Sequence, residues 1–259
     1  MTKHIKDGGV WKRAKDYFVR DGGVWKEVKT GEIKDGGVWK PFHQKLITRY
    51  GPFSNTNRLQ TTNDLPAFHP ITFACWASAY AECDVAWGIG QTANDQYRHY
   101  VSGYTGYMHA QTRDGSSNST ALQTIAYPQD SSWFHVAGVF NNTSDRRILY
   151  NGGNKITNTA SRDPGTTRAR MCIGTNAAAT YPWDDGYICH AAIWTTALSD
   201  SEIADLANGA LPSEVNAANL HSYLPMTGPD PAYVEAGNGS STWSVNGTIP
   251  STPNVLGPI

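Results

Sequence analysis

Apolar and polar residues alternate, or form short apolar blocks, over most of the chain, and both patterns are typical of strands. Asn151-Gly152 is predicted to turn residues 147–150 back onto residues 155–159. Residues 116–120 are polar throughout and are predicted to form a loop. The other expected strands are residues 71–78, 84–89, 97–101, 106–111, 121–126, 133–140, 168–174 and 187–194, with a further candidate at 242–245. The pattern therefore predicts an all-β domain.

One short helix is predicted directly after the strand at residues 187–194. Ser199 and Glu202 form a capping box, in which each side chain satisfies a free backbone amide of the first turn. Leu198 and Ile203 have the spacing of a hydrophobic staple across that turn. Gly209 fits the position just after the helix, where a positive φ is common. We therefore expect a helix of about two turns that packs through Ile203.

The first 45 residues contain a threefold repeat that is unlike the rest of the chain. The motif Asp-Gly-Gly-Val-Trp-Lys places its aspartates at positions 7, 21 and 35, a period of 14 residues. Glycines between short β-branched and aromatic runs predict tight hairpins, because glycine adopts positive φ without strain. Each repeat is therefore predicted to be a small hairpin that carries one tryptophan. The repeated residues are Gly8, Gly22 and Gly36 together with Trp11, Trp25 and Trp39.

A hairpin of this length cannot bury its own tryptophan, and an isolated two-stranded hairpin is marginal in water. The three tryptophans could pack together in a pseudo-threefold unit, against other copies of the chain, or against a partner. We expect residues 1–45 to be a docking and assembly module, with these tryptophans and glycines as its contact residues. The alternative is a self-contained cap on the main domain. We also expect a homo-oligomer, of which a trimer is one candidate.

The net charge of −1 conceals an uneven distribution along the chain. Residues 1–49 hold 12 Lys+Arg against 6 Asp+Glu, whereas the remainder holds 9 against 16. Because the lysines lie between glycine turns rather than in a run, we do not expect nucleic-acid binding. No apolar run approaches the roughly 18 residues of a membrane span. The basic start lacks an apolar signal core, so we expect folding in a cytoplasm.

The four cysteines lie within apolar or alternating segments, without the paired spacing of zinc sites. They are Cys75, Cys83, Cys172 and Cys189. We expect buried free thiols and no disulfide.

Three segments of the chain, in this order and spacing, resemble a known domain family. They are Trp133-Phe134-His135-Val136-Ala137, then residues 147–153, then residues 185–209 with Ala192-Ile193-Trp194 and the capped helix. Together they resemble a laminin-G-like domain of the concanavalin A-like lectin/glucanase group. The resemblance covers residues 46–228 and implies a jelly-roll β-sandwich with one short helix. The hairpin module, residues 1–45, would precede this sandwich, and a tail, residues 229–259, would pack along it.

The N-terminal repeat resembles Gly-Gly-Val-Trp-Lys repeats of bacteriophage tail and virion proteins. This resemblance implies a non-enzymatic virion protein, a tail or spike component that displays a lectin-like domain to host glycans. The alternative is a capsid decoration protein that stabilises the head. Its partners would be other virion proteins, bound through residues 1–45, and its location the virion, after synthesis in the host cytoplasm.

A glycan-cleaving enzyme is the third alternative. Some relatives carry Glu-x-Asp-x-x-Glu on one strand, and alternation sends its acids to one face. Here Glu82 and Asp84 supply the first two acids, but Trp87 occupies the third position. Retaining hydrolysis requires two opposed carboxyl groups, so we do not expect catalysis here.

Sugar binding is a candidate chemistry beside a purely structural role, because aromatic rings stack on the apolar faces of sugars. His99, Arg98 and Asp95 could fix hydroxyl groups. Asp184 and Asp185 offer hard oxygen ligands, so calcium is a candidate ion, although adjacent acids are more often a solvated loop. No other cofactor is expected. The aromatic candidates are Trp87, Tyr97, Tyr100, Tyr104, Tyr107 and Trp183, some of which are expected only to cover sheet faces.

Overall fold

The computed structural model places the chain in two compact units, residues 1–46 with 256–259, and residues 47–255. It describes residues 4–7, 10–13, 18–21, 24–27, 31–35, 38–43, 46–91, 98–115, 117–256 and 258. Side chains are described from residue 48 onward, apart from residue 104 and residues 253–257.

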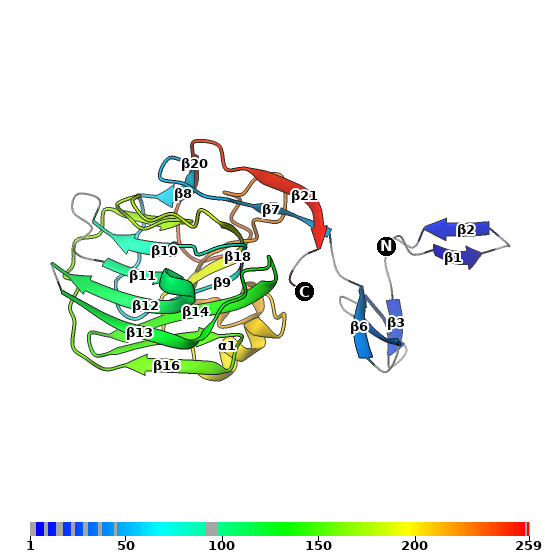
Figure 1. The fold of residues 1–259 in the computed structure, drawn as a ribbon, viewed down its shortest axis with the longest axis horizontal. Helices are drawn as coiled ribbons and strands as arrows, with labels where there is room; N and C mark the ends of the chain where they lie inside the picture. The colour runs from blue at the N-terminus through cyan, green and yellow to red at the C-terminus, as the bar shows by residue number, and fades with distance from the viewer. Residues whose placement is uncertain are drawn as a thin grey trace. The chain divides into compact units, whose positions relative to one another are not determined.

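The N-terminal unit contains three separate two-stranded antiparallel sheets (Figure 1). They pair β1 (His4–Asp7) with β2 (Val10–Arg13), β3 (Phe18–Asp21) with β4 (Val24–Glu27), and β5 (Gly31–Asp35) with β6 (Val38–His43). The aspartate of each motif pairs with the valine three residues on, which confirms the predicted hairpin pairing. Gly8, Gly22 and Gly36, and the side chains of Trp11, Trp25 and Trp39, lie outside the described residues.

Residues 47–255 form two antiparallel sheets that pack face to face, which confirms the predicted β-sandwich (Figure 1). The seven-stranded sheet has the order β13-β12-β11-β10-β17-β8-β20. Its strands are β8 (Arg58–Thr61), β10 (Val85–Gly90), β11 (Arg98–Ser102), β12 (Tyr107–Asp114), β13 (Ser117–Ala126), β17 (Arg170–Ile173) and β20 (Ser244–Asn246).

The eight-stranded sheet has the order β16-β15-β14-β9-β18-β7-β21, with β19 also paired to β18. Its strands are β7 (Leu46–Tyr50), β9 (Ile71–Ala79), β14 (Trp133–Asn142), β15 (Asp145–Tyr150), β16 (Asn154–Asn158), β18 (Gly186–Trp194), β19 (Leu220–Leu224) and β21 (Ser251–Leu256). The tail therefore supplies one strand to each sheet, β20 and β21. Only β20, near residues 242–245, was expected from the sequence.

The core fills the space between the two inner faces. Phe73 of β9 and Trp87 of β10 stack across it, with ring centroids 5.2 Å apart and planes 8° apart. Gly138 of β14 permits a close approach of the sheets, because a Cβ there would lie 2.3 Å from Val101 Cγ2. The Phe73 and Trp87 rings are completely buried, and burial of one such ring is worth about 2–3 kcal/mol.

The polar segment 116–120 is not a loop, so that prediction is wrong for residues 117–120. These residues begin β13, because their polar side chains find partners within the sandwich. Ser119 Oγ donates a hydrogen bond to Asn158 Oδ1 of β16 at 2.7 Å, and Thr120 Oγ1 accepts one from Gln111 Nε2 at 2.8 Å. Hydropathy alone gives no sign of such pairing.

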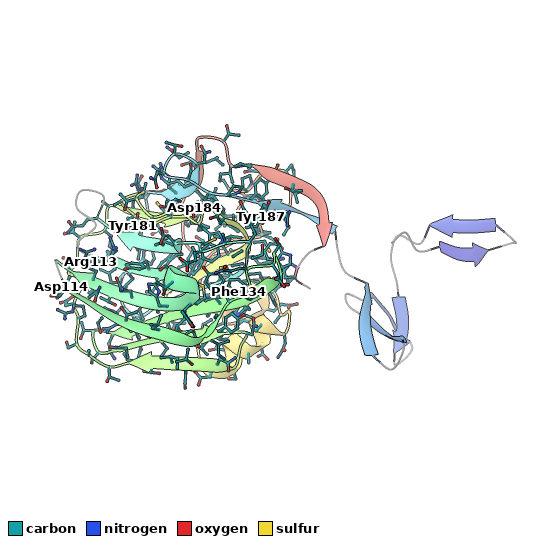
Figure 2. All side chains as sticks on the ribbon, viewed as in Figure 1. Arg113, Asp114, Phe134, Tyr181, Asp184 and Tyr187 are labelled. Carbon is teal, nitrogen blue, oxygen red and sulfur yellow. The ribbon has the colours of Figure 1, made fainter. Side chains whose placement is uncertain are left out.

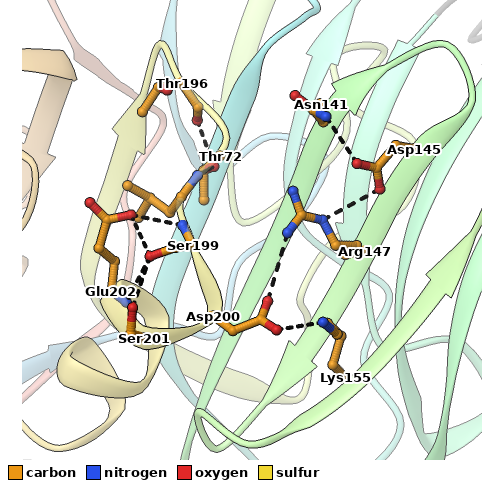
Figure 3. A network of polar contacts seen from close by, with 11 residues as sticks. Thr72, Asn141, Asp145, Arg147, Lys155, Thr196, Ser199, Asp200, Ser201 and Glu202 are labelled. Atoms are coloured by element: carbon orange, nitrogen blue, oxygen red, sulfur yellow. Dashed lines mark hydrogen bonds and ion pairs between the residues drawn. The ribbon is translucent and has the colours of Figure 1, made fainter.

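The predicted helix is α1 (Asp200–Ala207), and its capping box is confirmed (Figure 3). Ser199 Oγ accepts the amide hydrogen of Glu202 at 3.3 Å, and the Ser199 amide donates to Glu202 Oε2 at 2.7 Å. Gly209 adopts a φ of +95°, as expected after the helix. Asp200 at the helix start forms ion pairs with Lys155 and Arg147, which tie α1 to β16 and β15.

Three 3₁₀ turns complete the described elements: η1 (Tyr104–Gly106), η2 (Pro212–Glu214) and η3 (Ala217–Asn219).

Helix α1 covers one half of the outer face of the eight-stranded sheet. We call this the helix-covered half: Ala74 of β9, Ala137 and Val139 of β14, and Ala192 and Trp194 of β18. Leu198, Ile203 and Leu206 pack against it. The small alanines leave room for the helix.

The four cysteines are free and buried, as predicted. Burial raises the pKa of the Cys172 thiol to about 11, although Arg170 and Arg58 oppose the shift. Among the described residues, no helix has the length and apolar character needed to cross a membrane.

Candidate functional site

The outer face of the seven-stranded sheet carries a row of polar and aromatic side chains. Strand pairing aligns Arg98 with Arg113 and Tyr100 with Gln111, so these four residues lie on one face of β11 and β12. The alternate residues of these strands face the core. Val101 is an example, because a Cβ added at Gly138 of the other sheet would lie 2.3 Å from its Cγ2. Together with Tyr181, we call this surface the arginine–tyrosine face.

Gly88 of β10 lets a loop cross this face. Gly88 pairs with Tyr100, and Gly90 pairs with Arg98. A Cβ at Gly88 would lie 3.0 Å from the Cα of Asn176, a distance that side chains seldom tolerate. The loop after β17 can therefore pass over the sheet only where no side chain projects.

An arginine holds the crossing loop in place. Arg170 of β17 donates from Nε to the carbonyl oxygen of Ala177 at 2.7 Å. The loop returns to the sheet at Tyr181, whose carbonyl oxygen accepts the Val85 amide at 3.3 Å. This path brings Tyr181 onto the same surface as Arg98 and Tyr100.

Arg98 lies between two tyrosine rings. Its Cζ is 4.6 Å from the centroid of Tyr100 and 5.9 Å from that of Tyr181. Arg98 and Tyr100 are buried, whereas Tyr181 is 44 % exposed. Burial lowers the pKa of the Arg98 guanidinium and raises the pKa of the Tyr100 phenol. A cation near the ring face is attractive, so Arg98 helps to support an aromatic ring that remains open to solvent.

Several polar groups of β11 and β12 on this face are paired with one another. Gln111 donates to Thr120, and Ser102 Oγ and His109 Nε2 form a hydrogen bond of 2.8 Å. Burial lowers the pKa of His109 to about 4, so its ring is neutral near pH 7. Arg113 donates from Nε to the carbonyl oxygen of Gly115 at 3.1 Å and stays partly exposed. The floor of the face is therefore fixed before any ligand arrives.

Two of the predicted aromatic candidates lie in the core, which corrects the prediction for them. Trp87 and Trp183 have no exposed surface. Trp87 points inward and stacks on Phe73 of the other sheet. Trp183 Nε1 donates to the carbonyl oxygen of Ser78 at 3.3 Å. Neither ring is open to a sugar.

The remaining aromatic candidates have mixed positions. Tyr100 lies on the arginine–tyrosine face, and Tyr107 begins β12 with a partly exposed side chain. Tyr97 and the side chain of Tyr104 lie outside the described residues, as does Asp95. His99 faces the core, where it stacks on Phe140 at 4.2 Å, so it cannot bind a sugar hydroxyl.

Glu82, Asp84, Asp184 and Asp185 are the carboxylates near the start of β10. Among the described residues, no three acids, histidines or cysteines are grouped so that they could hold an ion, so Asp184 and Asp185 remain two neighbouring acids. Burial, opposed by a backbone hydrogen bond and reinforced by Asp185, raises the pKa of Asp184. Burial, Asp184 and Glu82 raise the pKa of Asp84 in the same way.

Tyr181 and Arg113 were not expected from the sequence (Figure 2). Alternation in residues 97–101 and 106–111 does place Arg98, Tyr100 and Gln111 on one side of their strands. Extending the second strand by two residues would have added Arg113. Tyr181 follows no periodic pattern, because a crossing loop positions it.

Comparison with solved structures finds the same fold at low sequence identity. The native heptameric SAP-like pentraxin of Limulus polyphemus matches with a TM-score of 0.54 and 13 % identity, over 82 % of this chain and 96 % of the pentraxin. A proposed carbohydrate-binding protein of Bacteroides ovatus matches with a TM-score of 0.53 and 18 % identity. That match covers 81 % of this chain and 60 % of the other protein. A search of curated proteins gives no match.

Comparison with protein families gives a match to a laminin-G model of the concanavalin A-like lectin/glucanases superfamily. The match spans residues 53–204, which is more than half of the chain and runs from just before β8 into α1. It includes β10, β11 and β12, which carry the arginine–tyrosine face. The chain therefore belongs to the concanavalin A-like lectin/glucanases superfamily.

Proposed function

We propose that the sandwich is a non-enzymatic, lectin-like domain that binds a glycan on the arginine–tyrosine face. The observation that carries this proposal is the exposed ring of Tyr181, set beside the buried pair Arg98 and Tyr100. An exposed aromatic ring stacks on the apolar face of a sugar. The partly exposed guanidinium of Arg113 supplies hydrogen-bond donors for hydroxyl groups at the edge of the ring.

The chemistry around β10 supports binding rather than cleavage. Trp87 fills the position where a glycan-cleaving relative carries its second catalytic acid, and it is completely buried. Glu82 and Asp84 lie before β10 in the chain. The strand itself, Val85–Gly90, contains no carboxylate. A buried indole cannot take the role of an acid or a nucleophile.

The N-terminal repeats support a role in a larger assembly. We place the protein in a bacteriophage virion, as a tail or spike component that docks through residues 1–45 and displays the sandwich. The support is the resemblance of the repeats to those of phage virion proteins, and the grouping of residues 1–46 as a unit separate from residues 47–255. A capsid decoration protein would use the same module, so the site of docking distinguishes the two roles.

Glycan binding is tested on a printed array of neutral and acidic oligosaccharides. The full chain should bind at least one glycan, and Tyr181→Ala should weaken binding to one or more of the bound glycans at least tenfold because a stacking surface is lost. Tyr233→Ala is the matched control, since Tyr233 is a 58 % exposed tyrosine elsewhere on the domain. Loss of binding in Tyr233→Ala instead would place the sugar in the groove of about 370 Å³ that Tyr233 lines with Met226 and Glu235.

Docking is tested with a variant that lacks residues 1–45 and with the triple variant Trp11→Ala, Trp25→Ala and Trp39→Ala. Both should yield folded sandwiches that no longer enter virions, because burial of each ring contributes about 2–3 kcal/mol to assembly. Electron microscopy of virions that carry the full chain should show it on the tail. Labelling over the capsid would support the decoration role, and normal incorporation of either variant would assign docking to the sandwich.

A further inference from the structure

The other half of the outer face of the eight-stranded sheet carries aromatic side chains instead of alanines. Strand pairing aligns Trp133 of β14, Ser78 of β9 and Tyr187 of β18 in one row. The next row aligns His135 with Trp76. We call these five residues, together with Arg49 of β7, the aromatic patch.

Close ring contacts hold the patch together. The guanidinium carbon of Arg49 lies 3.8 Å from the centroid of the Tyr187 ring, and the Trp76 and His135 rings meet edge to face at 5.5 Å. Tyr80, which is 44 % exposed, lies 6.3 Å from Tyr187 and borders the patch. Tyr187, Trp76 and Trp133 are each partly exposed, so solvent reaches a surface made mostly of rings.

Three polar atoms of the patch have no hydrogen-bond partner among the described residues. They are Ser78 Oγ, His135 Nδ1 and Arg49 Nε, each without solvent contact. Ser78 is 0 % exposed and His135 is 2 % exposed. A buried polar group without a partner costs about 1–3 kcal/mol, so native structures contain few of them. These three atoms lie on one small surface that also carries partly exposed rings.

We propose that the aromatic patch is a second saccharide-binding surface, selective for uncharged sugar rings. A hydroxyl group both donates and accepts hydrogen bonds, so one polyhydroxylated ring can pair with a serine hydroxyl, an imidazole nitrogen and a guanidinium. Its apolar face can stack on Tyr187 or Trp133 at the same time. The three strands span roughly 10 Å, which accommodates a sugar ring.

Other ligand classes fit the patch less well. An anion is disfavoured, because the negative charge of Asp185 lies near Tyr80 at the border of the patch. An aliphatic protein side chain would cover the rings but leave Ser78 and His135 unpaired. Ser78 lies between Trp133 and Tyr187 in the strand register.

This surface is separate from the arginine–tyrosine face, because the two lie on the outer faces of opposite sheets. In the view of Figure 2, Tyr181 is drawn beside β10 and Tyr187 beside β7. A chain with both surfaces would hold two sugars of one glycan layer, or two neighbouring glycans, and linkage of this kind raises overall affinity without new contacts. Variants can remove either surface independently.

The experiment compares four proteins on the printed array of neutral and acidic oligosaccharides: the full chain, Tyr181→Ala, Tyr187→Ala and the double variant. Equal thermal unfolding midpoints establish that each variant is folded. Tyr181→Ala should retain binding to a subset of neutral glycans, and Tyr187→Ala should lose at least tenfold on that subset. The double variant should bind none. Arg49→Gln should weaken the same subset and leave the acidic glycans unchanged.

Each other result overturns the inference. If Tyr181→Ala loses every glycan, the domain has one surface, and the proposed function stands without the second. If Tyr187→Ala keeps the full profile, the patch binds no sugar, and a protein partner is the remaining occupant. If the retained subset is acidic, the selectivity for uncharged rings is wrong. If the full chain binds no glycan, both proposals fail together.

Discussion

The two halves of one sheet face differ in how they are completed. In the helix-covered half, Ala74, Ala137 and Ala192 leave space that Ile203 and Leu206 of α1 fill. In the aromatic patch, the same three strands present Trp76, Ser78, Trp133, His135 and Tyr187 instead. Strand β18 has a bulge between Cys189 and Ala192, at the boundary of the two halves, and the side chains on either side of it differ in size.

Polar groups follow the same division. Thr72 Oγ1, at the edge of the helix-covered half, donates to the carbonyl oxygen of Thr196 at 2.7 Å and accepts the Leu198 amide at 3.0 Å. Trp194 Nε1 donates to the carbonyl oxygen of Val215 at 2.9 Å. The chain thus satisfies polar groups where its own helix covers the sheet, and leaves Ser78 and His135 unpaired where it does not.

The largest expected effect comes from removing the contact that covers the first half. Ile203→Ala leaves a cavity between α1 and the sheet, because Ile203 is completely buried. The free energy of unfolding should fall by about 2–4 kcal/mol, measured by urea denaturation. Asp205→Ala, at an exposed position of the same helix, is the control and should change it by less than about 0.5 kcal/mol. Equal effects would mean that α1 is not packed on the sheet.

Acid should weaken the aromatic half through His135. Burial lowers the pKa of His135 to about 3, whereas an unfolded histidine titrates near 6.5. Below about pH 6.5 the unfolded chain therefore binds a proton that the folded chain does not, so the free energy of unfolding falls as the pH falls. By pH 5 this loss is about 2 kcal/mol for one histidine.

The variant His135→Gln removes this titration. Urea denaturation at pH 7 and pH 5 should show a loss of stability about 2 kcal/mol smaller in the variant than in the parent chain. His109, whose pKa burial lowers to about 4, continues to titrate in both proteins. An unchanged difference between the two pH values would contradict the burial of a neutral His135.

A polar substitution tests the satisfied bonds of the helix-covered half. Thr72→Val keeps the shape of the side chain but leaves the Leu198 amide and the Thr196 carbonyl without this partner. The free energy of unfolding should fall by about 1–3 kcal/mol. Thr157→Val on the exposed strand β16 is the control, with no loss expected. If Thr72→Val leaves the free energy of unfolding unchanged, these backbone groups find water instead.

The helix cap should have a smaller effect. Ser199→Ala removes the oxygen that accepts the Glu202 amide and should cost about 1 kcal/mol. Ser201→Ala is the control. Ser201 lies two residues further along, and its hydroxyl pairs with Ser199 Oγ rather than with a backbone amide. If both variants have the same thermal unfolding midpoint as the parent chain, the cap prediction is wrong.

Local sequence patterns predicted most elements of the sandwich. Alternation or short runs of apolar and β-branched residues predicted β9, β14 and β18, because these strands are almost entirely buried. The capping residues found α1, since they act within four residues of one another. β13 was missed at its start because Ser119 is satisfied by Asn158, almost forty residues away.

The candidate site was predicted less well, because it depends on which strands are neighbours. Trp87 and Trp183 are aromatic residues of the kind that line sugar sites, but both side chains lie in the core. Tyr181 is positioned by a loop that needs Gly88 and Arg170 on other strands. The aromatic patch draws residues from β7, β9, β14 and β18, and no local pattern shows that these strands lie side by side.

The smallest expected effect is the most informative about the two halves. Ser78→Ala removes a buried hydroxyl that has no partner among the described residues, so it should leave the free energy of unfolding unchanged or raise it by up to about 1 kcal/mol. Ser102→Ala is the matched control: Ser102 is equally buried, but its hydroxyl pairs with His109 at 2.8 Å, and its loss should cost about 1 kcal/mol. If Ser78→Ala costs as much as Ser102→Ala, an ordered water already satisfies Ser78. The aromatic patch would then need no ligand to complete it.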